Sequence, residues 1–180
     1  DYFLVVSELV PYKRIDVAVR LFSRTGRPLR IVGGGPEYRK LRQMAKPNVQ
    51  FVGRVPDTEL RELYARARAL LLPGEEDFGI TPVEALSSGK PVIALGRGGA
   101  LETVPPFGGV FYDHPDEDQL AEAITRFERM EAQILPSELQ AWSRQFSESE
   151  FLRKFGAVLD EPDSGSAGRP IAYDRNTAVS

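Results

Sequence analysis

The chain has 180 residues, 42% of them hydrophobic and 27% charged, so it is long and apolar enough to bury the core of one globular domain. The net charge of −3, without a block of Lys or Arg, argues against a nucleic-acid-binding surface. The absence of cysteine excludes disulfides and fits the cytoplasmic location that we predict. No apolar run approaches the roughly 18 to 20 residues that cross a bilayer, so we expect no membrane segment in this chain.

Short apolar runs alternate with helical patterns along most of the sequence. The first strand is expected at 3–6, and the spacing of apolar residues over 15–22 predicts a helix with one buried face. Further strands are expected at 29–32, 49–52, 69–72, 91–95 and 109–112. After residue 115 the pattern is helical. Residues 160–180 are rich in Gly, Pro, Ser and Asp and are predicted to form a flexible tail.

Strands that are apolar nearly throughout, alternating with amphipathic helices, indicate a parallel sheet covered by helices on both faces. We therefore predict an α/β fold with a doubly wound, Rossmann-like sheet and helices at its carboxyl-terminal end, over residues 1–159. In such folds ligands bind beyond the carboxyl ends of the strands. Functional residues are accordingly expected in 7–14, 33–37, 53–57 and 73–84.

The segment around Gly79 has the pattern of a helix start at this edge of the sheet. Thr81 as the cap, Pro82 at the first helical position and Glu84 at the third are expected to form a capping box. Free N–H groups and the positive end of the helix dipole would then face the cleft. Because Glu76 precedes this helix, two carboxylates flank its N-terminus, which suits a ligand with several hydroxyls and a diphosphate.

The spacing of these two acids resembles a known family. Glu76 and Glu84, with seven residues between them, match the E-x7-E motif of retaining glycosyltransferases with the two-domain GT-B architecture. The flanking matches are Phe78-Gly79, Pro82, Glu84-Ala85, Ser88-Gly89, Pro91-Val92-Ile93 and Gly98-Gly99 with Glu102. The resemblance extends over about 1–155. Within the family, residues 9–16 and 76–80 are most similar to mannosyltransferases of surface-polysaccharide assembly.

The resemblance implies that the chain is the carboxyl-terminal, donor-binding domain of a retaining hexosyltransferase. Mannosyl transfer from GDP-mannose to a glycan or lipid-linked acceptor is the expected reaction, with a UDP-sugar as the alternative donor. No metal and no cofactor besides the nucleotide-sugar is expected, because Lys and Arg neutralise the diphosphate in such enzymes. We also expect the amino-terminal, acceptor-binding domain to be missing from this sequence, so that the isolated fragment is inactive.

The resemblance also assigns roles to single residues. Glu76 would bind sugar hydroxyls at the reacting centre, and Lys13 would clamp the diphosphate and stabilise it as a leaving group. Glu84 would hold the ribose, and Val55 would lie near the base. The other residues expected in donor binding are Phe78, Gly79, Ile80, Thr81, Arg14 and Gly34.

One position departs from the family pattern. The family usually has an arginine five residues before the clamp lysine, where this chain has Glu8. A carboxylate about 4 Å from a phosphate oxygen, at an effective dielectric constant of about 20, costs on the order of 4 kcal/mol before solvent reduces the repulsion. Either donor binding is weakened here, or the clamp is built differently, with Arg14 in place of the missing arginine or with Glu8 turned away.

Two alternative functions follow from the same residues. A dehydrogenase-like dinucleotide-binding domain is disfavoured, because the glycines at 33–35 do not continue into G-x-G-x-x-G: Tyr38 occupies the position of the last glycine. No acidic residue ends the second predicted strand either. A non-catalytic nucleotide-binding or interaction module is the other alternative, and Glu8 is the observation that supports it.

Overall fold

The computed structural model describes residues 1–76, 79–147 and 149–150. Three predictions fall on residues outside these ranges: the tail at 160–180, the end of the helical pattern at 159, and the site candidate Phe78. The elements discussed below belong to one compact unit, Asp1–Ser147. None of the helices described is long and apolar enough to cross a membrane.

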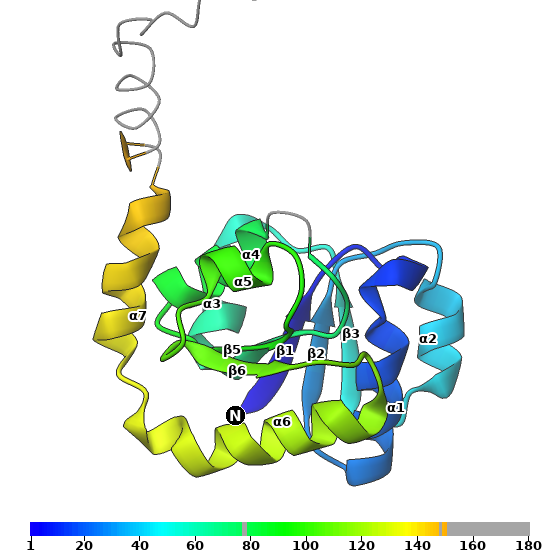
Figure 1. Ribbon diagram of the computed structural model, residues 1–180. Coiled ribbons are helices and arrows are strands. Elements are labelled where there is room, and N and C mark those ends of the chain that lie inside the picture. The colour runs from blue at the N-terminus through cyan, green and yellow to red at the C-terminus, as the bar shows by residue number, and fades with distance from the viewer. Residues whose placement is uncertain (77–78, 148, 151–180) are drawn as a thin grey trace, which may run out of the picture. The chain divides into compact units, whose positions relative to one another are not determined.

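All six predicted strands are present, and they form one parallel sheet. Their bounds are Tyr2–Val6 (β1), Leu29–Val32 (β2), Val49–Gly53 (β3), Ala67–Leu72 (β4), Val92–Leu95 (β5) and Gly109–Tyr112 (β6). The strand order is β3-β2-β1-β4-β5-β6, and every neighbouring pair is parallel (Figure 1). The chain therefore builds outward from β1 to β3, returns to the other side of β1, and builds outward again. This arrangement confirms the predicted doubly wound α/β fold.

Helices lie on both faces of the sheet, and each helix packs on the strand side chains of one face. The α-helices are Ile15–Thr25 (α1), Tyr38–Met44 (α2), Asp57–Arg66 (α3), Ile80–Ser87 (α4), Ala100–Thr103 (α5), Glu117–Met130 (α6) and Pro136–Ser143 (α7). The 3-10 turns are Pro11–Lys13 (η1), Glu131–Gln133 (η2) and Arg144–Phe146 (η3). Helices α1, α2 and α6 cover one face, and α3, α4, α5 and α7 cover the other (Figure 1).

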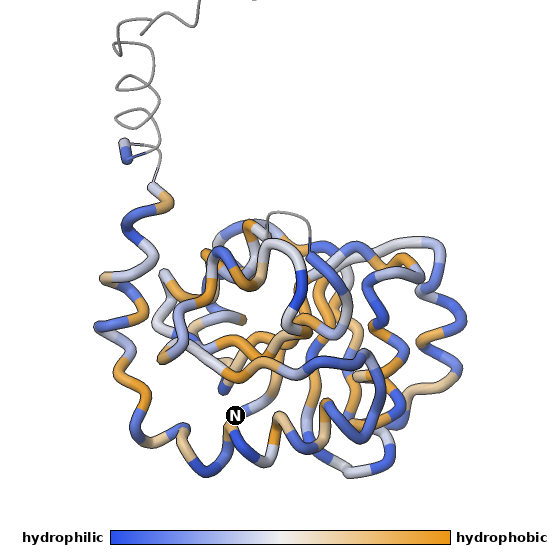
Figure 2. The backbone as a smooth tube through the Cα atoms, in the orientation of Figure 1, coloured by the Kyte–Doolittle hydropathy of each residue, from blue (hydrophilic) through white to orange (hydrophobic). Residues whose placement is uncertain are grey.

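The strands are apolar at nearly every position because both of their faces are buried. In β1, Phe3 and Val5 pack with α1 and α6, whereas Tyr2 and Leu4 pack on the opposite side of the sheet. Figure 2 shows hydrophobic residues concentrated along the strands at the centre, while the helices alternate between hydrophobic and hydrophilic colours. The sequence pattern that predicts a parallel sheet therefore has its cause in this two-sided burial.

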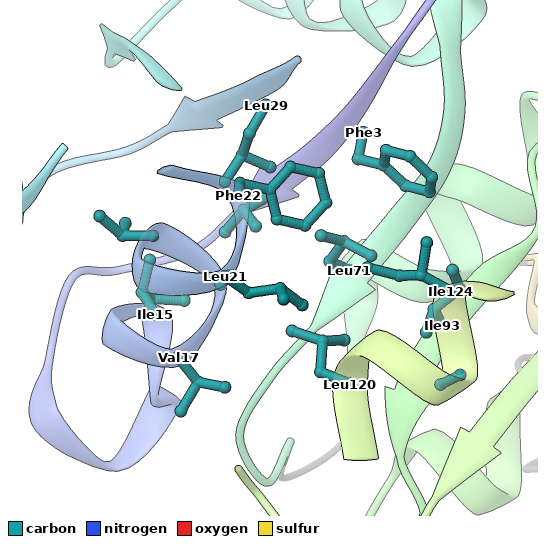
Figure 3. Packing of buried hydrophobic residues seen from close by; sticks show 14 of the residues in the cluster. Phe3, Ile15, Val17, Leu21, Phe22, Leu29, Leu71, Ile93, Leu120 and Ile124 are labelled. Atoms are coloured by element: carbon teal, nitrogen blue, oxygen red, sulfur yellow. The ribbon is translucent and has the colours of Figure 1, made fainter. Parts of the chain in front are cut away.

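The larger of the two cores lies under α1 and α6 (Figure 3). Phe22 of α1 meets Phe3 of β1 edge to face, with ring centroids 5.3 Å apart. Phe127 of α6 meets the same Phe3 ring from another side, with centroids 6.0 Å apart. Leu71 of β4 lies among these elements and is fully buried. This core fixes the central strands whose carboxyl ends carry the candidate site.

Leu71→Ala is expected to lower the free energy of unfolding by about 2 to 5 kcal/mol, because it leaves a cavity where the packing is tight on all sides. The measurement is a urea unfolding curve followed by circular dichroism. Leu101→Ala is the matched control, since Leu101 is 57% exposed. An equal loss of stability in the two variants would contradict the packing described here.

Candidate functional site

The candidate site residues gather where the order of the strands reverses, between β1 and β4. The loop after β1 leads through η1 into α1, and the loop after β4 leads into α4. Both loops leave the carboxyl edge of the sheet and lead to helices on opposite faces. Such a reversal of strand order is the place where open α/β sheets bind their ligands.

Lys13 ends the short turn that follows β1, and its side chain is largely buried. Its Nζ donates to Glu76 Oε1 at 2.9 Å and to the carbonyl oxygen of Glu75 at 3.2 Å. The side chains of Lys13 and Glu76 are 11% and 19% exposed. Water is thus partly excluded, and the attraction between the two charges is stronger than it would be on an open surface. The two residues predicted to act at the reacting centre are each other's partners.

Glu76 is held from its other side by the loop that follows β5. Its backbone forms an isolated parallel bridge with Gly98, and its carbonyl oxygen accepts from the Gly99 N–H at 2.7 Å. Main-chain contacts therefore fix the Cα of Glu76, which limits the groups that its carboxylate can reach. The ammonium group of Lys13 is the cation within reach.

A close contact between backbones brings the two loops together. A Cβ atom on Gly74 would lie 2.4 Å from the carbonyl oxygen of Tyr12 and 2.6 Å from the Cα of Lys13. Only glycine fits at such a distance, because no real Cβ approaches backbone atoms so closely. Gly74 follows β4 and Lys13 follows β1, so this contact sets the separation of the two functional loops.

Helix α4 begins differently from the sequence prediction. Gly79 has φ +73 and is the residue before the helix, which runs from Ile80. The predicted capping box is therefore wrong: Thr81 is the second helical residue and caps nothing. Its Oγ1 is buried without a hydrogen-bond partner in the part of the chain that the structure covers. The left-handed conformation of Gly79 turns the chain into the helix earlier than a Thr cap would. Pro82 is tolerated because the first N–H groups of a helix have no intrahelical partner.

Glu84 contacts a tyrosine and not the helix N-terminus. Its Oε2 accepts from the Tyr64 hydroxyl of α3 at 3.0 Å. Burial, and then the neighbouring Glu84 carboxylate, raise the pKa of the Tyr64 hydroxyl far above its ordinary value. Tyr64 therefore stays protonated and donates to Glu84 at any physiological pH, which keeps this carboxylate in one orientation.

Three hollows are lined by candidate site residues, two of them at the carboxyl edge of the sheet and one between α3 and α4. The first, of about 520 Å³, is lined by Val6, Ser7, Glu8, Val32, Gly33, Gly34, Arg54, Val55 and Thr81. The second, of about 270 Å³, is lined by Asp57, Leu60, Arg61, Tyr64, Glu84, Ser87 and Ser88. The third is a crevice of about 10 Å³ that includes Lys13 and Glu76, and it shares Ser7 with the first.

The structure thus brings some of the predicted site residues together and separates others. Gly34, Val55 and Thr81 share the first hollow. Gly79 lies against Glu76, since a Cβ on it would be 3.0 Å from Glu76 Cγ. Glu76 and Glu84 line different hollows and have different partners, so the unliganded chain does not aim these two carboxylates at one point.

Three further predictions concern residues at the margins of the site. Ile80 is 69% exposed at the start of α4. Arg14 lines none of the three hollows; its Nε lies 3.5 Å from Asp16 Oδ1. The hypothesis that Arg14 replaces the missing arginine therefore gains no support from the unliganded arrangement. Glu8 is exposed and lines the first hollow, so it is not turned away.

Sequence reasoning missed two residues of the site. Tyr64 has the spacing of an apolar helix face with Leu60 and Leu63, and nothing in that spacing indicates that its hydroxyl reaches Glu84. Arg54 directly follows β3, where the rule about strand ends points, but a single arginine there has no distinguishing pattern. Across 1–76, 79–147 and 149–150, no group of three or more acidic or His side chains is placed to hold a metal ion. Absence of a metal from the reaction stays a prediction.

Residues 1–145 match the family described as glycosyl transferases group 1. The chain belongs to this family. It is a glycosyltransferase domain of the donor-binding type, as the motif around Glu76 and Glu84 predicts. The family match extends from β1 into η3 and omits only Phe146 of that turn. It therefore includes every hollow described above.

Curated relatives of this glycosyltransferase domain include mannosyltransferases. The chain is 31% identical over 152 residues to the O-antigen chain mannosyltransferase RfbU of Salmonella typhimurium, covering 71% of this chain and 41% of that protein. It is 34% identical over 134 residues to a GDP-mannose-dependent monoacylated alpha-(1-6)-phosphatidylinositol monomannoside mannosyltransferase of Corynebacterium glutamicum, covering 66% and 35%. The chain thus spans less than half the length of either relative.

Solved structures share the fold. HepE of Anabaena, crystallised in complex with UDP, superposes with a TM-score of 0.76 at 23% identity, over 88% of this chain and 48% of that one. The lipopolysaccharide outer core galactosyltransferase WaaB, in its apo form, gives a TM-score of 0.75 at 22% identity, over 88% and 48%. This similarity agrees with the predicted GT-B type of Rossmann-like domain.

Gly74→Ala is expected to lower the free energy of unfolding by about 1 to 3 kcal/mol, because the added methyl group would force the loops after β1 and β4 apart. Urea unfolding measures the loss. Gly34→Ala is the matched control, since the nearest atom to its new Cβ is Arg54 Nε at 3.8 Å. If Gly74→Ala were as stable as Gly34→Ala, the close contact would not be what holds the two loops together.

Proposed function

We propose that this domain binds the nucleotide-sugar donor of a retaining mannosyltransferase, with GDP-mannose as the donor. The acceptor would be a glycan or a lipid-linked sugar, bound by a second domain. The observation that carries the proposal is the pairing of Lys13 with Glu76 at the strand-order reversal, beside the N-terminus of α4 and next to the first hollow. A cation for phosphate and a carboxylate for hydroxyls meet there.

The ion pair has a direct consequence for donor binding. A diphosphate that approaches Lys13 competes with Glu76 for the same ammonium group. When Lys13 turns to the phosphate oxygens, the Glu76 carboxylate loses its partner and can accept hydrogen bonds from sugar hydroxyls instead. Diphosphate and sugar would therefore be recognised together, because the Lys13–Glu76 ion pair is replaced by a contact from Lys13 to the diphosphate and a contact from the sugar to Glu76.

In the single-step transfer proposed here, configuration is retained because the acceptor oxygen attacks the face of the sugar from which the nucleoside diphosphate departs, and the departing phosphate oxygen takes the proton of the acceptor hydroxyl. The bond between the anomeric carbon and the phosphate oxygen breaks, and negative charge accumulates on that oxygen. Lys13 would stabilise this charge, assisted by the free N–H groups of Gly79, Ile80 and Thr81 at the start of α4. Glu76 would hold the sugar in the orientation that the attack needs.

The nucleoside part is expected beyond these groups. Val55 lines the apolar wall of the first hollow, and Glu84 is held by Tyr64 in the second. We propose that Glu84 accepts from the ribose hydroxyls while the Tyr64 hydroxyl keeps it oriented. Relatives support guanine as the base, since the Corynebacterium glutamicum enzyme is named as GDP-mannose-dependent. The complexes of HepE with UDP and with UDP-glucose make a UDP-sugar the alternative donor.

The purified chain is expected to bind GDP and GDP-mannose and to transfer no sugar by itself, because it spans less than half the length of its mannosyltransferase relatives. Glu84→Ala should weaken GDP binding about 10- to 100-fold, since it removes a charged acceptor for the ribose hydroxyls. Isothermal titration calorimetry measures the affinity, and Glu122→Ala is the matched control, because Glu122 is an exposed carboxylate of α6 that lines none of the three hollows. UDP and NAD complete the panel: binding of NAD alone would favour a dehydrogenase-like domain and refute the proposal.

A further inference from the structure

The first hollow contains two charged side chains that have no charged partner. Glu8 follows β1 and Arg54 follows β3, and both are exposed. Neither forms an ion pair with another residue within the described ranges of the chain. The rest of the wall is largely apolar, with Val6, Val32 and Val55 at the ends of three neighbouring strands. The hollow therefore has a largely apolar wall and one charge of each sign without a charged partner.

The backbone fixes the position of Arg54 closely. The pairing of β2 with β3 shifts register between Ile31 and Val32, so that Val32 lies opposite Gly53. The Gly33 N–H then donates to the Gly53 carbonyl oxygen at 2.8 Å, beyond the regular ladder. The Arg54 side chain extends over Gly34, where its Nε would be 3.8 Å from a Cβ atom. A glycine at this point leaves room for the guanidinium at the mouth of the hollow.

The sheet geometry separates Arg54 from the expected position of the diphosphate. Lys13 follows β1, and β3 lies two strands away in the sheet. Neighbouring strands are about 4.8 Å apart, so the two strand ends are separated by about 10 Å. Ser7 lines both the crevice of Lys13 and the first hollow, and joins them along the sheet edge. A donor with its diphosphate at Lys13 that extends along this edge past Ser7 would place its base in the first hollow, which Arg54 lines.

The charge of Glu8 also favours a base over a phosphate in this hollow. A carboxylate on the wall repels phosphate oxygens but not an uncharged ring. The apolar wall suits the face of such a ring. Beside the hydroxyls of Ser7 and Thr81, Arg54 is the cationic donor that lines this hollow and can reach an acceptor edge. Guanine presents two neighbouring acceptors, O6 and N7, that match the paired N–H groups of a guanidinium. Uracil has no such pair of adjacent acceptors on one edge.

We propose that Arg54 is the residue that selects the base of the donor, by donating two hydrogen bonds to O6 and N7 of guanine. This inference rests on the proposed function, since it takes the bound ligand to be a nucleotide-sugar. It adds a specificity-determining residue that the family motif around Glu76 and Glu84 does not include. It also gives a physical reason for GDP over UDP in this chain.

The test is calorimetric titration of the full 180-residue chain and its Arg54→Met variant with GDP, UDP and 7-deaza-GDP, which lacks the N7 acceptor. The unaltered chain is expected to bind GDP about tenfold or more tightly than UDP or 7-deaza-GDP. Arg54→Met should lose that preference, binding all three ligands within about threefold of one another, while its affinity for UDP changes little. Arg39→Met is the matched control, because Arg39 is exposed on α2 and lines none of the three hollows.

Each other outcome is informative. An unchanged preference for GDP in Arg54→Met would overturn this inference and leave the proposed function standing. An equal loss for GDP and UDP would mean that Arg54 contacts phosphate, and would also overturn it. If the unaltered chain bound neither GDP nor UDP, the proposed function itself would fail. Circular dichroism of each variant establishes that the fold is retained.

Discussion

The ion pair between Lys13 and Glu76 joins the two halves of the sheet at the point where the strand order reverses. It can form only because the loops after β1 and β4 touch, and they touch because position 74 has no side chain. Main-chain contacts to the loop after β5 hold Glu76 from the other side. The site is therefore built from loops that are far apart in sequence and rigid in space. Because Lys13 and Glu76 are both held in place, little reorganisation is needed when a ligand takes the place of Glu76 at Lys13 and of Lys13 at Glu76.

The fold could be predicted from the sequence because its cause is local. Strands buried on both faces are apolar at nearly every position, and α1 shows its buried face through Ile15, Ala18, Val19 and Phe22. No pattern within one segment predicts the order of the strands, because that order depends on which strands pair once β4 has formed on the other side of β1. The pairing of Lys13 with Glu76 is likewise a consequence of that order. The position after a strand predicts the segments that contain the two residues, and the family resemblance singles out Lys13 and Glu76 within them, but neither predicts their mutual contact.

The start of α4 shows why local rules fail at a site. Thr81, Pro82 and Glu84 fit a capping box in sequence, yet the left-handed conformation of Gly79 starts the helix earlier. Glu84 then faces α3, where the Tyr64 hydroxyl is its partner. Arg54 is a second case, because its importance follows from the register shift between β2 and β3 and from the open space over Gly34. Such features depend on neighbouring strands, which no spacing within one segment reveals.

A crystal structure of this chain with GDP bound tests most directly whether the diphosphate takes the place of Glu76 at Lys13. We expect a β-phosphate oxygen within hydrogen-bonding distance of Lys13 Nζ, with the contact from Lys13 to the Glu76 carboxylate broken or lengthened. The ribose would lie against Glu84 and the base in the hollow beside Val55. A complex with GDP elsewhere on the domain, and with the Lys13–Glu76 ion pair intact, would contradict it.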